Sequence, residues 1–264
     1  MNIQSFQFMI AFGDVEKNMT KVANLFRDSD LANVDVVVLP EMWTTGYDLE
    51  RIYDIAANDL NPVKGFIKGL AKEYDVNIVA GSIANKNDSG VKNTAFVIDR
   101  NGKLVHEYSK IHLVPMLNEP EYLTGGTSKV KIFELDGEKV GMVICYDLRF
   151  PEVFRDLAME DAKVIFVVAE WPVERTEHWI TLLRARAIEN QCYIVSSNVT
   201  GTQPTGATFA GKSIIVDPFG EIISEADAES EMKVDGILDL DYVRKVRKDI
   251  PIFSSRRKDM YKFL

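Results

Sequence analysis

The stretch "KVGMVICYDLRFPEVFRD" (139–156) runs from an apolar segment straight into a cysteine, Cys145, and then into charged and aromatic residues. The run up to Ile144 is typical of a buried strand, and a helix is predicted to begin near Phe150. The segment "KVKIFELDGEKVGMVIC" (129–145) predicts a hairpin that contains this strand. A hairpin joined to a strand-helix unit favours a mixed pair of sheets covered by helices over a purely parallel, doubly wound sheet.

The rest of the chain repeats this alternation of short β-branched runs and amphipathic stretches, so the predicted fold class is α/β. "IQSFQFMI" (3–10) and the uniformly apolar "VDVVVLP" (34–40) predict strands, and the apolar spacing from Val15 to Phe26 predicts a helix between them. Asn101-Gly102 indicates a tight hairpin. Further strands or hairpins are predicted at 76–83, 93–102, 103–110, 162–172, 192–201, 211–226 and 232–241, and further helices around 61–74 and at 174–191.

Composition restricts the class of protein. At 264 residues, 46% hydrophobic and 27% charged, the chain is long enough for a full core, and we expect one domain over 1–264. A formal net charge of −9 argues against a nucleic-acid partner. No apolar run approaches the roughly 20 residues of a membrane helix, and the first residues lack the features of a signal peptide. We therefore expect a cytoplasmic protein that binds no membrane.

Three polar residues follow predicted strands. Glu41 follows "VVVLP", Lys110 follows "LVHEYS" and Cys145 follows "GMVI". In open α/β sheets, reacting groups gather at the carboxyl ends of strands, so these ends can point a carboxylate, an ammonium and a thiol at one crevice. A thiol needs a base or a positive field to become a nucleophile, and this set supplies both. The arrangement indicates acyl transfer.

Each of these residues has a simpler interpretation, and Glu41 and Lys110 alone are more often solvated surface charges. A lone cysteine at the end of an apolar strand is usually a small core residue, and two cysteines are too few for a disulfide framework. Cys192, in "NQCYIVSS", is interpreted as core. His112 is the one serious alternative base for Cys145, whereas His106 and His178 are expected to pack or to form hydrogen bonds. No His/Cys spacing fits a metal site and no phosphate-binding loop is present, so neither a metal nor another cofactor is predicted.

Five segments in order resemble the nitrilase, or carbon-nitrogen hydrolase, superfamily along almost the whole chain. Taken together they are specific, although each alone is weak. The segments are "VVVLPEMWTTGY" (36–47), "YSKIHLVPMLNEPEYLTGG" (108–126), "GMVICYDLRFPE" (141–152), "AEWPVERTEHWITLLRARAIENQCYIVSSNVTG" (169–201) and "GKSIIVDPFGE" (211–221).

The resemblance implies a four-layer α-β-β-α sandwich and a homodimer. The family's glutamate, lysine and cysteine triad falls on Glu41, Lys110 and Cys145, the residues already found at strand ends. The family's second glutamate falls on Glu119, with Glu121 two residues away as the other candidate. A tail from about residue 247 carries several apolar residues and is expected to pack on its own chain or at the dimer interface.

The resemblance and the chemistry together imply a mechanism. Glu41 takes the proton of Cys145, and the sulfur attacks the carbonyl carbon of an amide. Lys110 and the backbone N–H of Tyr146 are the candidate donors to the oxyanion. Ammonia leaves, water hydrolyses the thioester, and Glu119 positions groups or holds Lys110.

The same segments suggest walls for a substrate pocket. Trp43, Phe150 and Trp171 are candidates for the walls, with core packing as the alternative for each. Arg149 and Asp147 are expected to brace the turn after Cys145 or to face substrate. Candidate partners for a substrate carboxylate are Arg149, Arg175 and Arg184, and ion pairs within the helix are the alternative for Arg184 and Arg186.

Within the superfamily, "PEMWTTGYD", "ICYDLRFPE" and "AEWPVERTEHW" look most similar to the bacterial omega-amidases. That resemblance implies a small-molecule substrate, the monoamide of a 2-oxo dicarboxylic acid. The alternatives are an N-carbamoyl or short-chain aliphatic amidase, a nitrilase with the same triad, and, in a different class, a non-catalytic ligand-binding protein on this fold.

Overall fold

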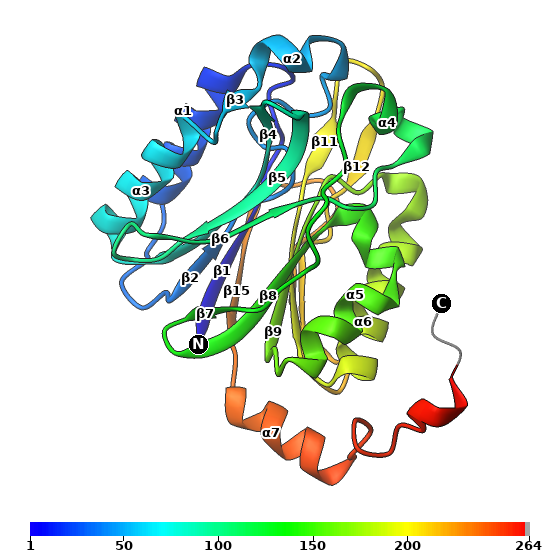
Figure 1. Ribbon diagram of the computed structural model, residues 1–264. Helices are drawn as coiled ribbons and strands as arrows, with labels where there is room; N and C mark the ends of the chain where they lie inside the picture. Colours follow the sequence, from blue (N-terminus) through cyan, green and yellow to red (C-terminus); the bar gives the residue numbers. More distant parts are fainter. Residues whose placement is uncertain (262–264) are drawn as a thin grey trace.

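Two β-sheets pack face to face at the centre of the protein (Figure 1), whose computed structural model describes residues 1–261. The first sheet has the order β15 (Met232–Ile237), β1 (Asn2–Gln7), β2 (Val36–Val38), β4 (Asn77–Asn87), β5 (Gly90–Ile98) and β6 (Leu104–Ser109), with β3 (Ala57–Asn58) beside β4. The second has the order β14 (Ile222–Glu225), β13 (Ile214–Val216), β10 (Tyr193–Asn198), β9 (Val164–Ala169), β8 (Glu138–Ile144) and β7 (Phe133–Leu135).

Helices cover the outer face of each sheet. On the first sheet lie α1 (Val15–Arg27) and α3 (Val63–Tyr74), and on the second lie α5 (Pro151–Met159) and α6 (Thr176–Asn190) (Figure 1). The start of α1 is fixed by the Asp14 side chain, which accepts a hydrogen bond from the Lys17 amide at 3.0 Å. The predicted four-layer α-β-β-α sandwich is therefore confirmed.

The core lies between the two sheets. The first sheet contributes Val38 and Val79 to it, and the second contributes Phe166 and Val168, all of them fully buried. Every residue of β9 is buried, as expected for a strand covered on both faces. Burying one such side chain contributes about 1.5–3 kcal/mol, so this interior sets the distance and orientation of the sheets.

Strand direction brings Glu41 and Lys110 to the same edge of the first sheet. β2 and β4 are parallel, and two successive antiparallel pairings, β4 with β5 and β5 with β6, return β6 to the direction of β2. The carboxyl ends of β2 and β6 therefore point the same way. In the second sheet, β8, β9 and β10 are parallel, so the ends of β8 and β9 also meet at one edge.

A bulge in β4 supports the turn that carries Glu41. The pairing with β5 is irregular between Val79 and Ser82, and Gly81 has φ +61°. A Cβ at Gly81 would lie 2.0 Å from the Pro40 carbonyl oxygen, so only glycine fits. The Met42 amide donates a hydrogen bond to Ser82 Oγ at 3.0 Å, which connects the turn after Glu41 to the bulge in β4.

Several elements were not predicted from the sequence, and α7 (Leu240–Asp249) is the longest of them. The expected tail boundary at 247 falls inside this helix. The other unpredicted elements are short: α2 (Ile52–Ile55), β3, α4 (Glu119–Tyr122), the hairpin of β11 (Thr200–Thr202) and β12 (Thr208–Ala210), and the 3-10 turns η1 (Leu49–Arg51), η2 (Pro115–Leu117), η3 (Cys145–Arg149), η4 (Val173–Arg175) and η5 (Lys258–Met260). No helix within residues 1–261 is long and apolar enough to cross a bilayer.

Candidate active site

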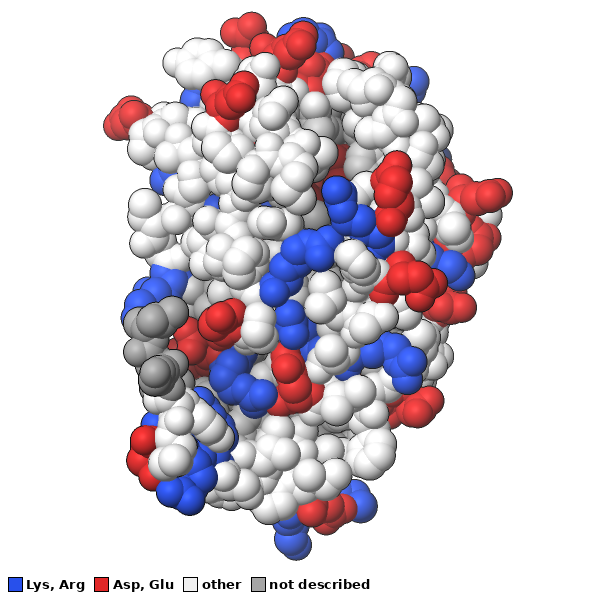
Figure 2. All heavy atoms as spheres, turned by 90° about the vertical axis from the view of Figure 1, so that its right-hand side faces the viewer, with Lys and Arg blue, Asp and Glu red and all other residues white. Residues whose placement is uncertain are grey.

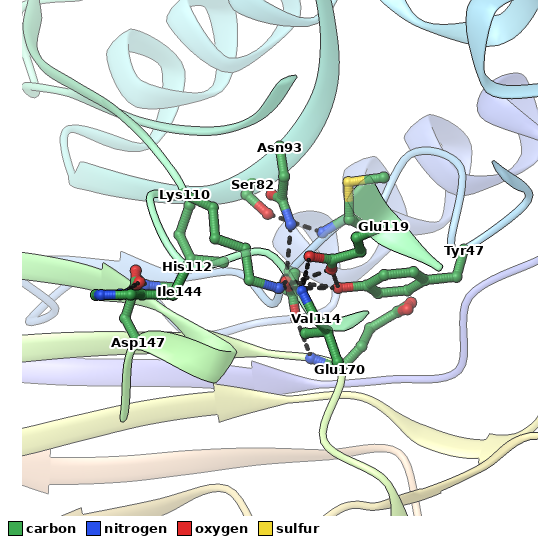
Figure 3. A network of polar contacts seen from close by, with 12 residues as sticks. Tyr47, Ser82, Asn93, Lys110, His112, Val114, Glu119, Ile144, Asp147 and Glu170 are labelled. Atoms are coloured by element: carbon green, nitrogen blue, oxygen red, sulfur yellow. Dashed lines mark hydrogen bonds and ion pairs between the residues drawn. The ribbon is translucent and has the colours of Figure 1, made fainter. Parts of the chain in front are cut away.

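A buried ion-pair cluster lies at the edge where the strand ends meet (Figure 3). Lys110, just after β6, places Nζ 2.9 Å from Glu41 Oε1 and 2.8 Å from Glu119 Oε1. All three side chains are fully buried. The remaining candidate, Glu121, is exposed, so the structure puts Glu119 and not Glu121 beside the lysine.

Tyr47 completes this cluster and was not predicted from the sequence. Its hydroxyl lies 2.8 Å from Glu41 Oε1 and 2.6 Å from Glu119 Oε1, and it accepts from Lys110 Nζ at 3.2 Å. Burial, followed by the charges of Glu119 and Glu41, raises the pKa of Tyr47 well above its ordinary value, so the phenol keeps its proton. A tyrosine six residues after a glutamate in a turn carries no signal that sequence reasoning could use.

The two neighbouring glutamates keep Lys110 charged. Burial alone would lower the pKa of Lys110, but Glu41 and Glu119 outweigh it and raise that pKa above its ordinary value. An ammonium held between two carboxylates stays protonated and cannot serve as a base. Lys110 is therefore a fixed positive charge in this site.

Backbone and amide donors fix the orientation of both carboxylates. Asn93 Nδ2 donates to Glu41 Oε1 at 2.8 Å, and the Glu170 amide donates to Glu41 Oε2 at 2.8 Å. The Val114 amide donates to Glu119 Oε2 at 2.7 Å. Because these donors come from the end of β9, from the loop after β6 and from the interior of β5, the site forms only when both sheets are assembled.

Cys145 stands on a sharp turn directly after β8. It has φ +42°, a left-handed conformation that costs a non-glycine residue about 1–2 kcal/mol. Burial, then the charge and a hydrogen bond of Glu41, raise the pKa of Cys145 well above its ordinary value, whereas Lys110 lowers it. Without substrate, Cys145 is therefore a protonated thiol, and its hydrogen-bond partner is Glu41.

Asp147 braces this turn, as the sequence suggested. Its buried carboxylate accepts from the Ile144 amide at 3.1 Å and from the Tyr108 hydroxyl at 2.8 Å, and it lies 2.7 Å from His112 Nδ1 (Figure 3). His112 is thus bound to Asp147, and its ring stacks on Phe150 with centroids 3.6 Å apart. This arrangement places His112 in the brace of the turn and assigns it no contact with the sulfur.

A small pocket opens at Cys145 and is lined by residues from three strand ends. Arg149 lies in its wall with the guanidinium carbon 4.7 Å from the centroid of the Trp171 ring. The other lining residues are Val114, Met116, Leu117, Tyr146, Glu170, Pro172 and Arg175. Of the four predicted pocket side chains, Arg149 and Trp171 line this pocket.

The other two lie elsewhere. Trp43 is fully buried in the cluster beneath α1 and α3, and its indole N–H donates to the Ala80 carbonyl at 2.8 Å, so it is a core residue. Phe150 is half-buried against His112 and is not part of the pocket wall. Arg184 is also outside the pocket, because it donates to the Gly220 carbonyl.

The remaining histidines and the second cysteine do not join this site. His106 stacks on Phe133, and burial followed by the charge of Lys131 lowers its pKa to about 4. His178 Nδ1 lies 3.5 Å from Arg149 Nη1 on the exposed side of α6. Cys192 is fully buried in the core, as predicted. Within residues 1–261, no group of three or more His, Cys, Asp or Glu side chains could hold a metal ion.

Comparisons with known proteins agree with this geometry. The carbon-nitrogen hydrolase family model matches residues 3–248. "Hydrolase in agr operon" from Staphylococcus aureus is 46% identical over 99% of this chain and 100% of its own length. "2-oxoglutaramate amidase" from Bacillus subtilis (strain 168) is 43% identical over 98% of both chains. A crystal structure of XC1258 from Xanthomonas campestris, described as a CN-hydrolase superfamily protein with an arsenic adduct in the active site, superposes with a TM-score of 0.91 at 30% identity, covering 100% of this chain and 98% of the other.

Proposed function

The chain belongs to the carbon-nitrogen hydrolase family and hydrolyses the C–N bond of amides, and on this premise we propose that its substrates are monoamides of short 2-oxo dicarboxylic acids. The relatives named 2-oxoglutaramate amidase and "Omega-amidase YafV" from Escherichia coli support this substrate class. The observation that carries the proposal is that two arginines in the pocket of Cys145 form no ion pair with a carboxylate of residues 1–261.

Arg149 and Arg175 line the pocket without a carboxylate partner. Among the described residues, neither forms an ion pair. Arg186, in contrast, is paired with Glu189 at 2.9 Å. A guanidinium that is partly withdrawn from water and unpaired can bind a carboxylate with two parallel hydrogen bonds. Figure 2 shows Lys and Arg side chains gathered in a band across the face of the molecule that carries α5 and α6. Such a band favours the approach of an anionic substrate to an otherwise acidic protein.

The cluster supports a division of roles in acyl transfer. Glu41 Oε1 already accepts from Lys110, Tyr47 and Asn93, whereas Oε2 accepts one backbone hydrogen bond, from the Glu170 amide. Oε2 is therefore the oxygen with room to take the thiol proton. As the proton leaves, the sulfur of Cys145 attacks the amide carbon.

The developing oxyanion needs donors in place. Lys110 uses its three N–H groups on Glu41, Glu119 and Tyr47, and the bond to Tyr47 is the longest at 3.2 Å. That donor is the one that turns to the oxyanion, together with the backbone N–H of Tyr146. Glu41 then returns the proton to the leaving ammonia, and water activated by the same carboxylate hydrolyses the thioester. Glu119 holds Lys110 in position throughout.

The test compares kcat/KM on 2-oxoglutaramate and 2-oxosuccinamate with that on propionamide, butyramide, an N-carbamoyl amine and a short nitrile. We expect the acidic amides to be preferred by at least about 100-fold, because a neutral substrate leaves the arginines unpaired. The Arg149→Gln variant should lose about 10- to 100-fold on the acids and little on butyramide. Arg184→Gln, outside the pocket, is the matched control. Equal or better rates on the neutral compounds would reject the proposed substrate class and leave a general amidase.

We also infer that the protein is a cytoplasmic homodimer. A surface cavity of about 310 Å³ beside α6 and α7 is lined mostly by apolar residues, with Glu189 and Gln191 as the exceptions, and Ile188, Phe219 and Ile250 leave 50%, 55% and 45% of their surface exposed. So much exposed apolar surface in one patch is typical of an interface, and a second copy related by a two-fold axis would cover it. Light scattering should report about twice the chain mass of 29.8 kDa. A monomer at micromolar concentration would contradict the dimer.

A further inference from the structure

Glu170 is a buried carboxyl group in the candidate active site to which the mechanism above gives no chemical role. It follows β9 directly and lines the pocket of Cys145 with only 1% of its surface exposed. Its backbone amide donates a hydrogen bond to Glu41, but its side chain is not part of the ion-pair cluster. Figure 3 shows its carboxyl group turned away from Lys110.

One oxygen of this carboxyl group has no partner. Oε1 accepts a long hydrogen bond of 3.5 Å from Gln203 Nε2. Oε2 is fully buried and, within residues 1–261, has no hydrogen-bond partner. Leaving a buried polar atom unpaired costs about 1–3 kcal/mol, so an unpaired atom on a residue that lines the pocket points to a group that a ligand supplies.

The surrounding charges decide the protonation state of Glu170. The charged and titratable groups that face it are Glu41 from the end of β2, Tyr47 from the loop after β2, Lys110 from the end of β6, Glu119 from α4, Cys145 and Arg149 from η3, and Arg175 from η4. Lys110 is already shared by two carboxylates. Burial, followed by the charge of Glu41, raises the pKa of Glu170 well above its ordinary value, and Lys110 only partly offsets this. Glu170 is thus a neutral carboxylic acid.

The position of its proton follows from the hydrogen bonds. Oε1 accepts from Gln203, so it is the carbonyl oxygen, and the hydroxyl is on Oε2. The pocket therefore holds one uncharged O–H donor in addition to the arginines. A 2-oxo group is an uncharged acceptor, which suits a neutral donor, whereas the substrate carboxylate suits a guanidinium.

We propose that Glu170 in its protonated form donates a hydrogen bond from Oε2 to the 2-oxo oxygen of the substrate and so sets the preference for 2-oxo acids over the corresponding simple acids. This inference rests on the proposed function, since it names the group that recognises one part of that substrate class. Glu170 is a specificity residue in this scheme, and the covalent steps are still carried out by Cys145 and Glu41.

The experiment uses pairs of substrates that differ only in the 2-oxo group: 2-oxosuccinamate with succinamate, and 2-oxoglutaramate with glutaramate. For each pair, the ratio of kcat/KM values isolates recognition of the 2-oxo oxygen from recognition of the carboxylate. Glu170→Leu removes the donor and should reduce the ratio about 10- to 100-fold. Glu170→Gln keeps the shape and offers an N–H in place of the O–H, so it should keep most of the ratio. Glu174→Gln, exposed in η4 and outside the pocket, is the control.

A pH profile separates this role from a purely structural one. In the wild type, the kcat/KM ratio of a pair should fall as the pH rises, because ionised Glu170 can no longer donate. In Glu170→Gln the ratio should stay constant with pH. Thermal melting of all variants checks that they fold.

The outcomes are distinguishable. If Glu170→Leu lowers both members of each pair equally, or if Glu170→Gln keeps the alkaline fall, the assignment of Glu170 is wrong even though the enzyme prefers acidic amides. If the wild type prefers butyramide to all four acids, the proposed substrate class fails first, and the variants of Glu170 are not needed to show it.

Discussion

Cys145 and Cys192 have much in common in sequence, yet their surroundings differ in every respect that matters for chemistry. Both lie beside apolar strands of the second sheet, both are buried, and burial raises the pKa of both. Cys192 has φ in the ordinary range. Among the described residues no carboxylate forms a hydrogen bond with its thiol, and the charges that lower its pKa are those of Arg247 and Arg155. Cys145 stands in a left-handed turn with Glu41 as its bonding partner and a pocket in front of it. The comparison teaches that burial alone makes a thiol inert, and that a base and an opening make it a candidate nucleophile.

The largest expected difference is in turnover. Cys145→Ala should abolish amide hydrolysis, because no other thiol lies among the described residues that line the pocket, whereas Cys192→Ala should keep kcat within about threefold of the wild type. Steady-state ammonia release measures both. Trapping a slow substrate on the wild type should add acyl mass to the peptide that contains Cys145. Acyl mass on Cys192 would refute the assignment.

The second difference is the base. Glu41→Gln should reduce kcat by about 10³-fold or more, because an amide cannot take the thiol proton but keeps the shape of the site. His112→Asn should cost far less, since His112 contacts Asp147 and Phe150 in the brace of the turn. Comparable losses in the two variants would favour a cysteine-histidine pair over the carboxylate.

The third difference is reactivity toward iodoacetamide, a reagent that itself carries an amide. Burial raises the pKa of Cys192 to about 12, from an ordinary value near 9, so its thiolate fraction at pH 8 is about 10³-fold below that of a free thiol. Cys145 has Glu41 as a base and faces the pocket. Mass spectrometry of the folded protein at pH 8 should therefore find Cys145 labelled first, and Cys192 labelled only after denaturation or as the pH approaches 12. Early labelling of Cys192 would contradict its place in the core.

The smallest expected difference is in stability, and its sign reverses between the two sites. At φ +42°, glycine avoids the steric cost that alanine bears, so Cys145→Gly should be more stable than Cys145→Ala by about 1 kcal/mol. At position 192 the order should be opposite by about 0.5–1 kcal/mol, since glycine there gains only freedom in the unfolded chain. Urea unfolding of the four variants tests this. The same order at both sites would mean that the turn at Cys145 is not strained.

Much of this comparison was accessible from the sequence. The positions of Glu41, Lys110 and Cys145 after apolar runs, and the order of five motifs, indicated the layers of the fold and where the strand ends lie. The sequence could not find Tyr47 or the role of Glu170, because a hydroxyl or a carboxyl group in a turn looks the same whether it faces solvent or a buried cluster. It also left Trp43 as a candidate for the pocket wall with core packing as the alternative, since a tryptophan two residues after a predicted base fits both.

By itself, the sequence determined the alternation of strands and helices, the family and the amide chemistry, because hydrophobic periodicity and motif residues are local properties of the chain. Tertiary structure alone decided which charges meet. Lys110 lies 69 residues from Glu41 in sequence, and the Glu170 amide that fixes Glu41 lies 129 residues away. Their contact depends on two antiparallel pairings in one sheet and on the packing of that sheet against the other. Whether a buried acid is ionised or neutral depends on how many cations that packing brings within a few ångströms. The local sequence around the acid does not determine how many cations lie that close.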